Sequence, residues 1–225
     1  MKKLIQTITT AFAILIGNAV LSQVDSVYFV KGDSILSVYA TTDVDSVIFY
    51  RPTITPTTIE LSIGDSAHGG IVAYILQSGD VGYDANVQHG LIAAPTDQGT
   101  ARWGCIGTPI SGADGTDFGT GNQNTADILA GCSATNIAAY LCDTLTLGGY
   151  NDWFLPSKDE LNKLYKNIGQ GNALGLGNVG GFASYYYWSS SVLGIYGAWS
   201  QFFGDGNQFN LSKDGLSNVR AVRAF

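Results

Sequence analysis

The spacing of apolar residues is helical over PSKDELNKLYKNIG, residues 156–169. Four apolar side chains recur at i, i+3, i+4 and i+7 and so share one face: Leu161, Leu164, Tyr165 and Ile168. Ser157 followed three residues later by Glu160 is typical of a capping box, in which each side chain satisfies a free backbone N–H of the first turn. Gly169 is a stop signal. The pattern predicts a helix over Ser157–Ile168.

The other elements follow from shorter patterns. GGIVAYIL (69–76) and HGLIAAP (89–95) are typical of strands, and a helical stretch is predicted from about Thr125 to Asp143 with a break at Gly131. Residues 183–225 alternate as strands.

Glycine-rich segments separate these elements. Turns are expected at 204–207 and 213–215, a polar loop at 111–124 and an irregular loop at 169–182, which holds six glycines in fourteen residues. Strands, then helices, then strands predict an α+β domain that begins near Ile59.

The first 22 residues have the three parts of a secretory signal peptide. Lys2 and Lys3 form the basic start, residues 11–16 the apolar centre, and small residues close it near Ser22. Polar residues interrupt the apolar run before it reaches the ~20 residues that a membrane anchor needs. We therefore expect an exported chain without a membrane span.

Residues 23–58 form a short segment of their own. VDSVYF (24–29) and VDSVIF (44–49) are near copies in which apolar and polar residues alternate, and they predict short strands around a turn at 31–33. RPTITPTTIE, which contains two prolines, is typical of a linker. The expected organisation is a signal peptide (1–22), a β-rich segment with a linker (23–58) and a main domain (59–225).

Charge excludes one class of partner. Only 13% of the residues are charged, against ~25% in an ordinary domain. Without Lys2 and Lys3, nine basic residues face eighteen acidic ones, a net charge of −9. Because polyanions are repelled by such a surface, we expect no nucleic-acid partner.

The three cysteines permit one disulfide. Cys132 and Cys142 are ten residues apart, and one unbroken helix would hold them ~15 Å apart, too far to bridge. Cys105–Cys132 is therefore the favoured pair, with Cys142 as a buried thiol. Three reduced, buried cysteines remain the alternative.

Residue types that carry chemistry occur in two places. Ser189–Ser191 lack both a recognisable histidine partner and the G-x-S-x-G context of a nucleophile, so we expect turn and strand-end hydroxyls there and no catalytic residues. The loop at 111–127 holds side chains with the hard oxygen ligands that Ca²⁺ prefers: Asp114, Asp117, Asn122, Asn124 and Asp127. Their spacing does not match a calcium loop, and turn formation is the simpler interpretation. No cofactor is expected.

Residues 184–218 have the composition of a contact surface. Of these 35 residues, 19 are Ser, Tyr, Gly or Asn, the mixture that antibody paratopes use. Trp188, Trp199 and Phe202 are expected to pack inward as a frame. The side chains assigned to ligand contact are Leu193, Ile195, Tyr196, Gln201, Phe203, Asp205, Phe209, Leu211, Asp214 and Leu216.

GYNDWFLPSKDELNKLY, followed by YYWSSS, AW and the terminal VRAVRAF, resembles the DUF1566 family. This family is also described as the C-terminal domain of the Legionella collagen-like protein, with the Fibrobacter major paralogous domain as a related label. The resemblance spans about residues 66–225. It implies a C-type-lectin-like fold with two main helices and a mixed, mostly antiparallel sheet, often on exported proteins of Bacteroidetes. Some members bind glycosaminoglycans, but a charge of −9 argues against sulfated sugars here.

The resemblance leads to one main hypothesis on function and two alternatives. The main hypothesis is a cell-surface module that binds a protein or a glycan on another cell or a phage, without a catalytic role. A related hypothesis is that a retroelement diversifies residues 192–218, which would leave Trp199, Gln201, Gln208 and Lys213 as frame positions because the mutated codons cannot encode them. The alternatives are a self-associating surface or matrix subunit, and an enzyme of the formylglycine-generating type.

Overall fold

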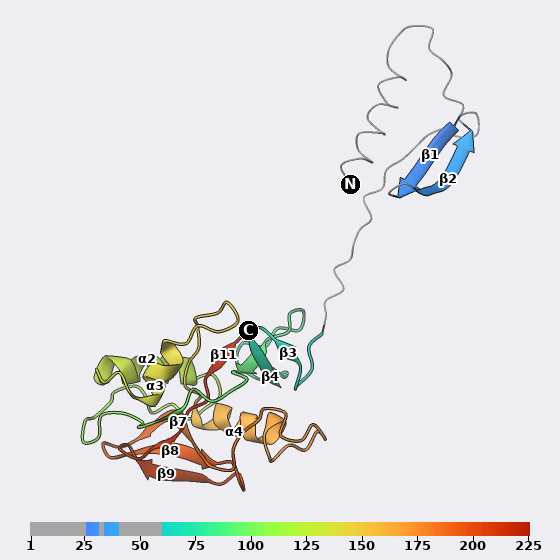
Figure 1. Ribbon diagram of the computed structural model, residues 1–225. Coiled ribbons are helices and arrows are strands. Elements are labelled where there is room, and N and C mark those ends of the chain that lie inside the picture. The colour runs from blue at the N-terminus through green and yellow to red at the C-terminus, as the bar shows by residue number, and fades with distance from the viewer. Residues whose placement is uncertain (1–25, 32–33, 41–59) are drawn as a thin grey trace. The chain divides into compact units, whose positions relative to one another are not determined.

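The computed structural model describes residues 26–31, 34–40 and 60–225. The chain divides into two compact units, 1–57 and 58–225 (Figure 1). In the first unit, β1 (Ser26–Lys31) pairs antiparallel with β2 (Ser34–Ala40). β1 agrees with the strand predicted at 24–29, whereas its partner β2 lies between the two copies and not at the second copy. The predicted signal peptide, the second copy at 44–49 and the linker up to residue 59 lie outside the described residues.

The second unit contains two sheets. The four-stranded sheet has the order β11 (Val222–Ala224), β5 (Gly90–Ala93), β4 (Gly70–Ile75) and β3 (Ser66–Ala67). The five-stranded sheet has the order β6 (Thr100–Ala101), β10 (Ser217–Asn218), β7 (Tyr186–Leu193), β8 (Gly197–Phe202) and β9 (Gln208–Ser212). Among the described strands only β10 and β7 pair in parallel.

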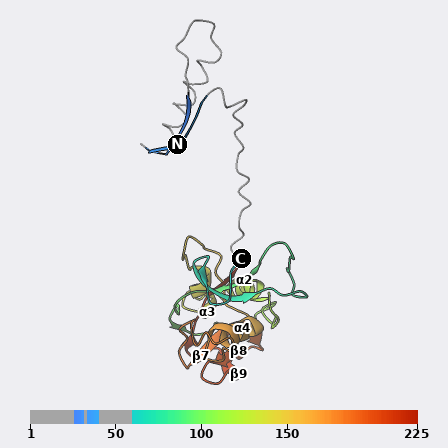
Figure 2. The same cartoon turned by 90° about the vertical axis from the view of Figure 1, so that its right-hand side faces the viewer.

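Three helices pack on these sheets: α2 (Gly121–Gly131), α3 (Ala138–Asp143) and α4 (Lys158–Ile168). α4 packs against β4, β7 and β8, and α2 packs against β7 and α3 (Figures 1 and 2). One cluster of buried side chains surrounds Trp103 and Trp188, and a second lies under α4 around Leu161 and Phe203.

The α+β class is confirmed, with differences in detail. The predicted helix at 125–143 forms as α2 and α3, which are separated after Gly131 as expected, but α2 begins four residues earlier, at Gly121. The expectation of two main helices and one sheet is therefore incomplete, since the domain has a third helix and its strands divide between two sheets. Strand periodicity identifies strands but not the sheet that each one joins.

A group of buried polar side chains joins the helices to the five-stranded sheet. This polar junction consists of Asn124, Ser157, Glu160, Ser190 and Ser191, all of them buried. Glu160 accepts the backbone N–H groups of Ser157 at 2.7 Å and Gly119 at 2.9 Å, and Ser157 Oγ accepts the N–H of Glu160 at 3.2 Å. The predicted capping box is thereby confirmed, and Glu160 additionally fixes the loop before α2.

The serines of the junction hold the same loop to β7. Ser191 Oγ donates to the carbonyl of Gly115 at 2.7 Å and accepts the N–H of Lys158 at 3.0 Å. Asn124 Nδ2 donates to the same carbonyl at 2.6 Å and to Ser190 Oγ at 3.2 Å. One buried network therefore links α2, α4, β7 and the loop at 111–120. The serines lie inside β7, which corrects the expectation of turn and strand-end hydroxyls.

Gly121 gives a test of this junction. A Cβ at Gly121 would lie 2.2 Å from a carboxylate oxygen of Glu160 and 2.9 Å from the ring of Phe154. Gly→Ala in a helix is ordinarily stabilising, by up to ~1 kcal/mol. We expect Gly121→Ala to lower the free energy of unfolding by about 1–3 kcal/mol in urea titrations, because of overpacking. The exposed neighbouring variant Asn122→Ala should change it by less than about 0.5 kcal/mol. Equal or greater stability of Gly121→Ala would contradict the packing described.

Glu160 also predicts a pH dependence. Burial raises its pKa from 4.5 to about 7, and this effect outweighs the backbone N–H groups, which favour the carboxylate. Between these two values the folded chain retains a proton that the unfolded chain has released. Stability therefore falls as the pH rises from about 4.5 to about 7, by up to about 3 kcal/mol. Unfolding measured at pH 5 and pH 8 should show a smaller decrease in Glu160→Gln than in the parent. The same decrease in both chains would exclude Glu160 as its source.

Candidate ligand-binding surface

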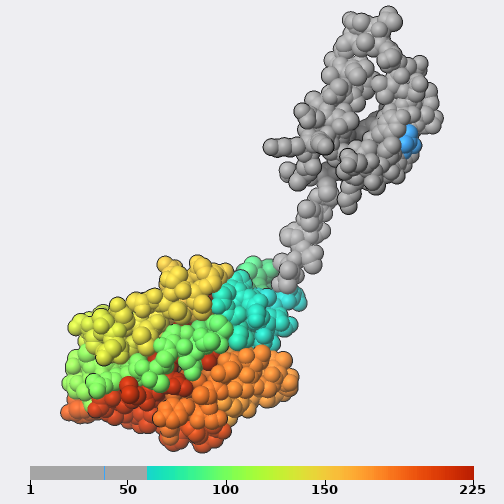
Figure 3. Space-filling model, in the orientation of Figure 1, coloured from blue at the N-terminus to red at the C-terminus, as the bar shows by residue number. Residues whose placement is uncertain are grey.

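Three segments meet beyond the ends of β7 and β8: the loop 105–108, the turn 193–196 and the turn 213–216. The N–H of Gly107 donates to the carbonyl of Ile195, and the N–H of Lys213 donates to that of Tyr196, both at 2.9 Å. In Figure 3 the segment around residue 100 runs beside the C-terminal segments, in agreement with the bond from the Trp103 N–H to the Lys213 carbonyl. These segments carry large apolar side chains that are 38–65% exposed: Ile106, Leu193, Ile195, Tyr196 and Leu216. We call these five residues the turn surface.

A disulfide fixes one of the three segments. Cys105 is bonded to Cys132, directly after α2, with their Cα atoms 5.7 Å apart. The pairing predicted from the spacing is confirmed, and Cys142 is the buried free thiol. Ile106 thus follows a residue that is covalently tied to the end of α2.

A buried lysine fixes the same loop from the other side. The side chain of Lys213 is 0% exposed, and its Nζ lies 4.7 Å from the centre of the Trp103 ring and 3.4 Å from the carbonyl oxygen of Thr108. Among the described residues no carboxylate pairs with it. Burial consequently lowers the pKa of Lys213. The attraction of the cation to the indole face offsets part of the cost of burying the charge.

The assignment to ligand contact is wrong for two residues, because both are buried. Gln201 and Phe203 are 0% exposed. Gln201 Nε2 donates to Asn162 of α4 and to the carbonyl of Gly206, and Phe203 packs against the ring of Tyr165. Side chains alternate along a strand, so Gln201 lies on the face of β8 that α4 covers, and Phe203, one residue beyond the strand, lies on the same side.

The other contact residues occupy three separate places. Leu193, Ile195, Tyr196 and Leu216 belong to the turn surface, and Asp214 and the half-buried Leu211 lie beside them. Asp205 is in the turn at the opposite end of β8, ~20 Å away along a six-residue strand. Phe209 belongs to a row of partly exposed rings that we call the aromatic face: Tyr185, Tyr186, Phe202 and Phe209.

The expected frame is confirmed at Trp188, which is buried. Trp199 and Phe202 keep partial exposure, which corrects the expectation that they pack inward. The Lys158 ammonium lies 4.7 Å from the centre of the Trp199 ring, and the Phe202 ring lies 5.0 Å from that of Tyr186.

The suggested calcium ligands do not form one loop. Because α2 begins at Gly121, Asn122, Asn124 and Asp127 lie on a helix, whereas Asp114 and Asp117 precede it. The amide of Asn124 is used in the polar junction. In the described part of the chain, no group of three or more His, Cys, Asp or Glu side chains could hold a metal ion.

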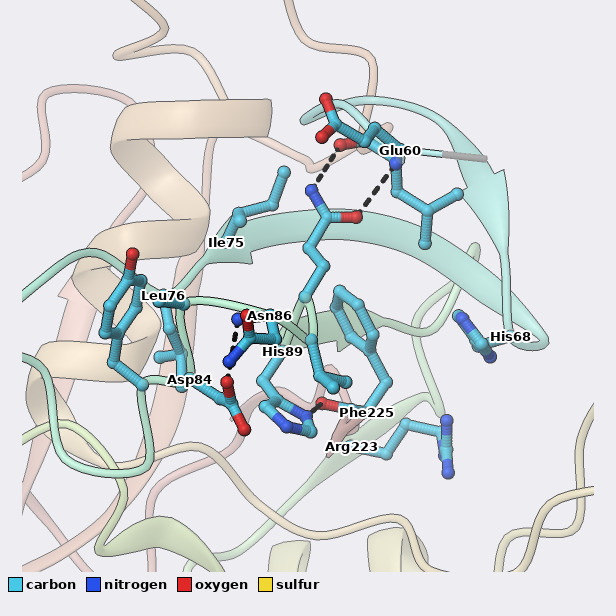
Figure 4. Close-up of a pocket in the computed structure, with 14 residues that line it drawn as sticks. Glu60, His68, Ile75, Leu76, Asp84, Asn86, His89, Arg223 and Phe225 are labelled. Carbon is cyan, nitrogen blue, oxygen red and sulfur yellow. Dashed lines mark hydrogen bonds between the residues drawn. The ribbon is translucent and has the colours of Figure 1, made fainter. Parts of the chain in front are cut away.

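The four-stranded sheet borders a pocket of about 670 Å³ that the sequence did not indicate (Figure 4). Both histidines of the sequence line it. His89 Nδ1 donates to the Phe225 carbonyl at 3.1 Å, and the His68 ring stacks on the Phe225 ring with the centroids 5.0 Å apart. Among the described residues, neither imidazole is hydrogen-bonded to a serine or a carboxylate.

The three cysteines are a disulfide pair and one buried thiol. Two of the three cysteines form the disulfide, and the third, Cys142, is fully buried. Burial raises the pKa of its thiol, with a smaller contribution from the nearby Asp143 carboxylate. A reactive cysteine needs a stabilised thiolate and access to solvent.

No helix in the described ranges is long and apolar enough to cross a membrane; the longest, α2 and α4, have eleven residues each.

The family model of the Lcl C-terminal domain matches residues 108–223, more than half of the chain. The match confirms the family expected from the sequence, over a shorter range, since β3 to β6 precede it. No curated protein matches the chain.

Thiol titration tests the cysteine assignment. Without reductant, the folded chain should give no reactive thiol, because Cys142 is buried. The unfolded chain should give one thiol, and reduction in denaturant should give three. Labelling of the folded chain without reductant would mean that a cysteine is accessible, and this result would reopen the enzymatic alternative.

Proposed function

The chain belongs to the Lcl C-terminal domain family, and we propose that it is an exported cell-surface module that binds a ligand without catalysis. We include a C-type-lectin-like fold in this proposal. The family is consistent with a surface-associated module, and the signal-like first 22 residues support export. The partner is a protein or a glycan on another cell or on a phage.

The observation that carries the proposal is the turn surface. Five large apolar side chains stand exposed on three short segments, whereas surface apolar residues are ordinarily scattered. Those segments are tied by the Cys105–Cys132 disulfide, by buried Lys213 and by backbone hydrogen bonds. A pre-ordered surface loses little conformational entropy on binding, which favours affinity.

Exposure supports diversification of residues 192–218 as part of this function. Of the four residues expected as frame positions, Gln201 and Lys213 are buried, and Trp199 and Gln208 are half-buried. The turn at 193–196 is exposed. Such an arrangement tolerates sequence change at the surface without loss of the core. Related genes that differ mainly at AAC codons of the exposed positions would support it, and uniform variation over 184–218 would count against it.

Self-association as a structural subunit is the second candidate. The exposed rings of Tyr185 and Phe209 favour it, because an aromatic surface of this kind can pack against a copy of itself. The mass in solution at increasing concentration separates a monomeric binder from such a subunit.

A glycan and surface-protein array tests the binding proposal. We would compare the parent chain with a variant carrying Ile106→Ser, Leu193→Ser, Ile195→Ser and Tyr196→Ser. The matched control changes four other exposed side chains: Val81→Ser, Val87→Ser, Leu174→Ser and Val179→Ser.

Truncation of an apolar contact at the centre of an interface costs about 1–2 kcal/mol, so if only two of the four side chains are central the first variant should bind the array hit at least about 30-fold more weakly. The control should bind like the parent. Equal weakening of both variants, or of neither, would place the ligand elsewhere.

A further inference from the structure

The outer edge of β9 is open. β9 is the last strand of the five-stranded sheet, and no described strand pairs with its far side (Figure 1). The Phe202 N–H donates to the Asn207 carbonyl, and the Lys213 N–H donates to the Tyr196 carbonyl, both at 2.9 Å. Hydrogen-bonded residues alternate along an antiparallel ladder, so Phe209 and Leu211 also direct their backbone groups to β8.

The residues between them direct their backbone groups outward. By the same alternation, the N–H and carbonyl of Gln208 and of Asn210, and the N–H of Ser212, point away from the sheet. The carbonyl of Ser212 is taken by the N–H of Gly215. These outward groups form a pattern that an added strand can match.

This edge lacks the usual protection against strand pairing. Its sequence QFNLS contains no proline and no charged residue. All five of its residues pair with β8 without a bulge. The other edge strands of the 58–225 unit, β6, β3 and β11, have only two or three residues. Native proteins ordinarily blunt a long edge with lysine, proline or a bulge.

Charge and apolar surface indicate the kind of strand that fits. Asp205 and Asp214, both exposed, flank the two ends of β9. Within the described residues, their carboxylates accept hydrogen bonds only from Asn207 and Ser212. Beside the edge, Phe209 packs its ring 5.7 Å from that of Tyr186 on the aromatic face. A second copy of β9 would bring further aspartates to these ends, and the whole chain carries a net charge of −7. A basic segment meets the same edge with attraction.

We propose that the outer edge of β9 binds an extended segment of a partner protein, as a sixth strand of the sheet. Apolar side chains of that segment lie over the aromatic face, and Lys or Arg at its two ends lie opposite Asp205 and Asp214. The site is at the side of the sheet and does not depend on the turn surface.

A labelled synthetic peptide tests the proposal by fluorescence anisotropy on the whole chain. The probe is Lys-Thr-Val-Thr-Val-Thr-Val-Lys, with a second peptide that has Glu at both ends. Asn210→Pro removes an outward N–H but no bond to β8, and Asn210→Thr keeps that N–H. We expect saturable binding of the basic peptide at low salt, at least tenfold weaker in Asn210→Pro and within about threefold of the parent in Asn210→Thr.

Two further arms keep the test independent of how the proline variant folds. A basic peptide N-methylated at all six internal residues should not bind the parent chain, because the donors on both of its edges are lost. Asp205→Asn with Asp214→Asn should weaken binding of the basic peptide and reduce its salt dependence. The proposal is overturned by equal binding of the acidic peptide, by unchanged binding of the N-methylated peptide, or by a parent dimer that Asn210→Pro abolishes.

Discussion

A buried carboxylate that must be hydrogen-bonded determines how this domain is assembled. Glu160 is 1% exposed, and its oxygens accept backbone N–H groups from both the start of α4 and the loop before α2. A buried charge without hydrogen bonds would cost several kcal/mol. Movement of either segment away from Glu160 would therefore remove a hydrogen bond that the buried carboxylate needs. Gly121 has no side chain at the place where α2 approaches Glu160, which makes the contact possible.

The position of β7 follows from the same network, and the turn surface follows from β7. Ser190 and Ser191 attach the middle of β7 to Asn124 of α2 and to Lys158 of α4. The strand then ends at Leu193, where the chain leaves the core and its side chains become exposed. The disulfide and Lys213 hold the neighbouring loop against that turn. These buried contacts, taken together, hold the exposed side chains of the turn surface in fixed positions.

The sequence allowed prediction of the features that depend on near neighbours. The capping box of α4 and the strand β1 follow from signals within a few residues. The pair Cys105–Cys132 was predicted correctly, but Cys132 follows α2 and Cys142 lies on α3, so the helix geometry that favoured this pair does not hold. Features that depend on distant pairing could not be predicted. Whether Gln201 and Phe203 face solvent is decided by α4, which covers one face of β8. Lys213 fixes the loop that carries Ile106 because its side chain lies against Trp103 and Thr108. Both of these residues precede Lys213 by more than 100 positions, so their contact could not be predicted. The predicted contact surface was continuous in sequence, but a strand of six residues separates its parts in space.

Native-state hydrogen exchange can show whether the turn surface and the polar junction belong to one rigid body. The N–H of Ser190 and of Val192 bond to Pro156 and Ala113 at the junction, and those of Gly107 and Lys213 bond to Ile195 and Tyr196 at the turn surface. In one rigid body, all four amides exchange only through global unfolding, with similar opening free energies. Exchange of Gly107 and Lys213 through a low-energy local opening, while the junction amides stay protected, would contradict a single rigid body.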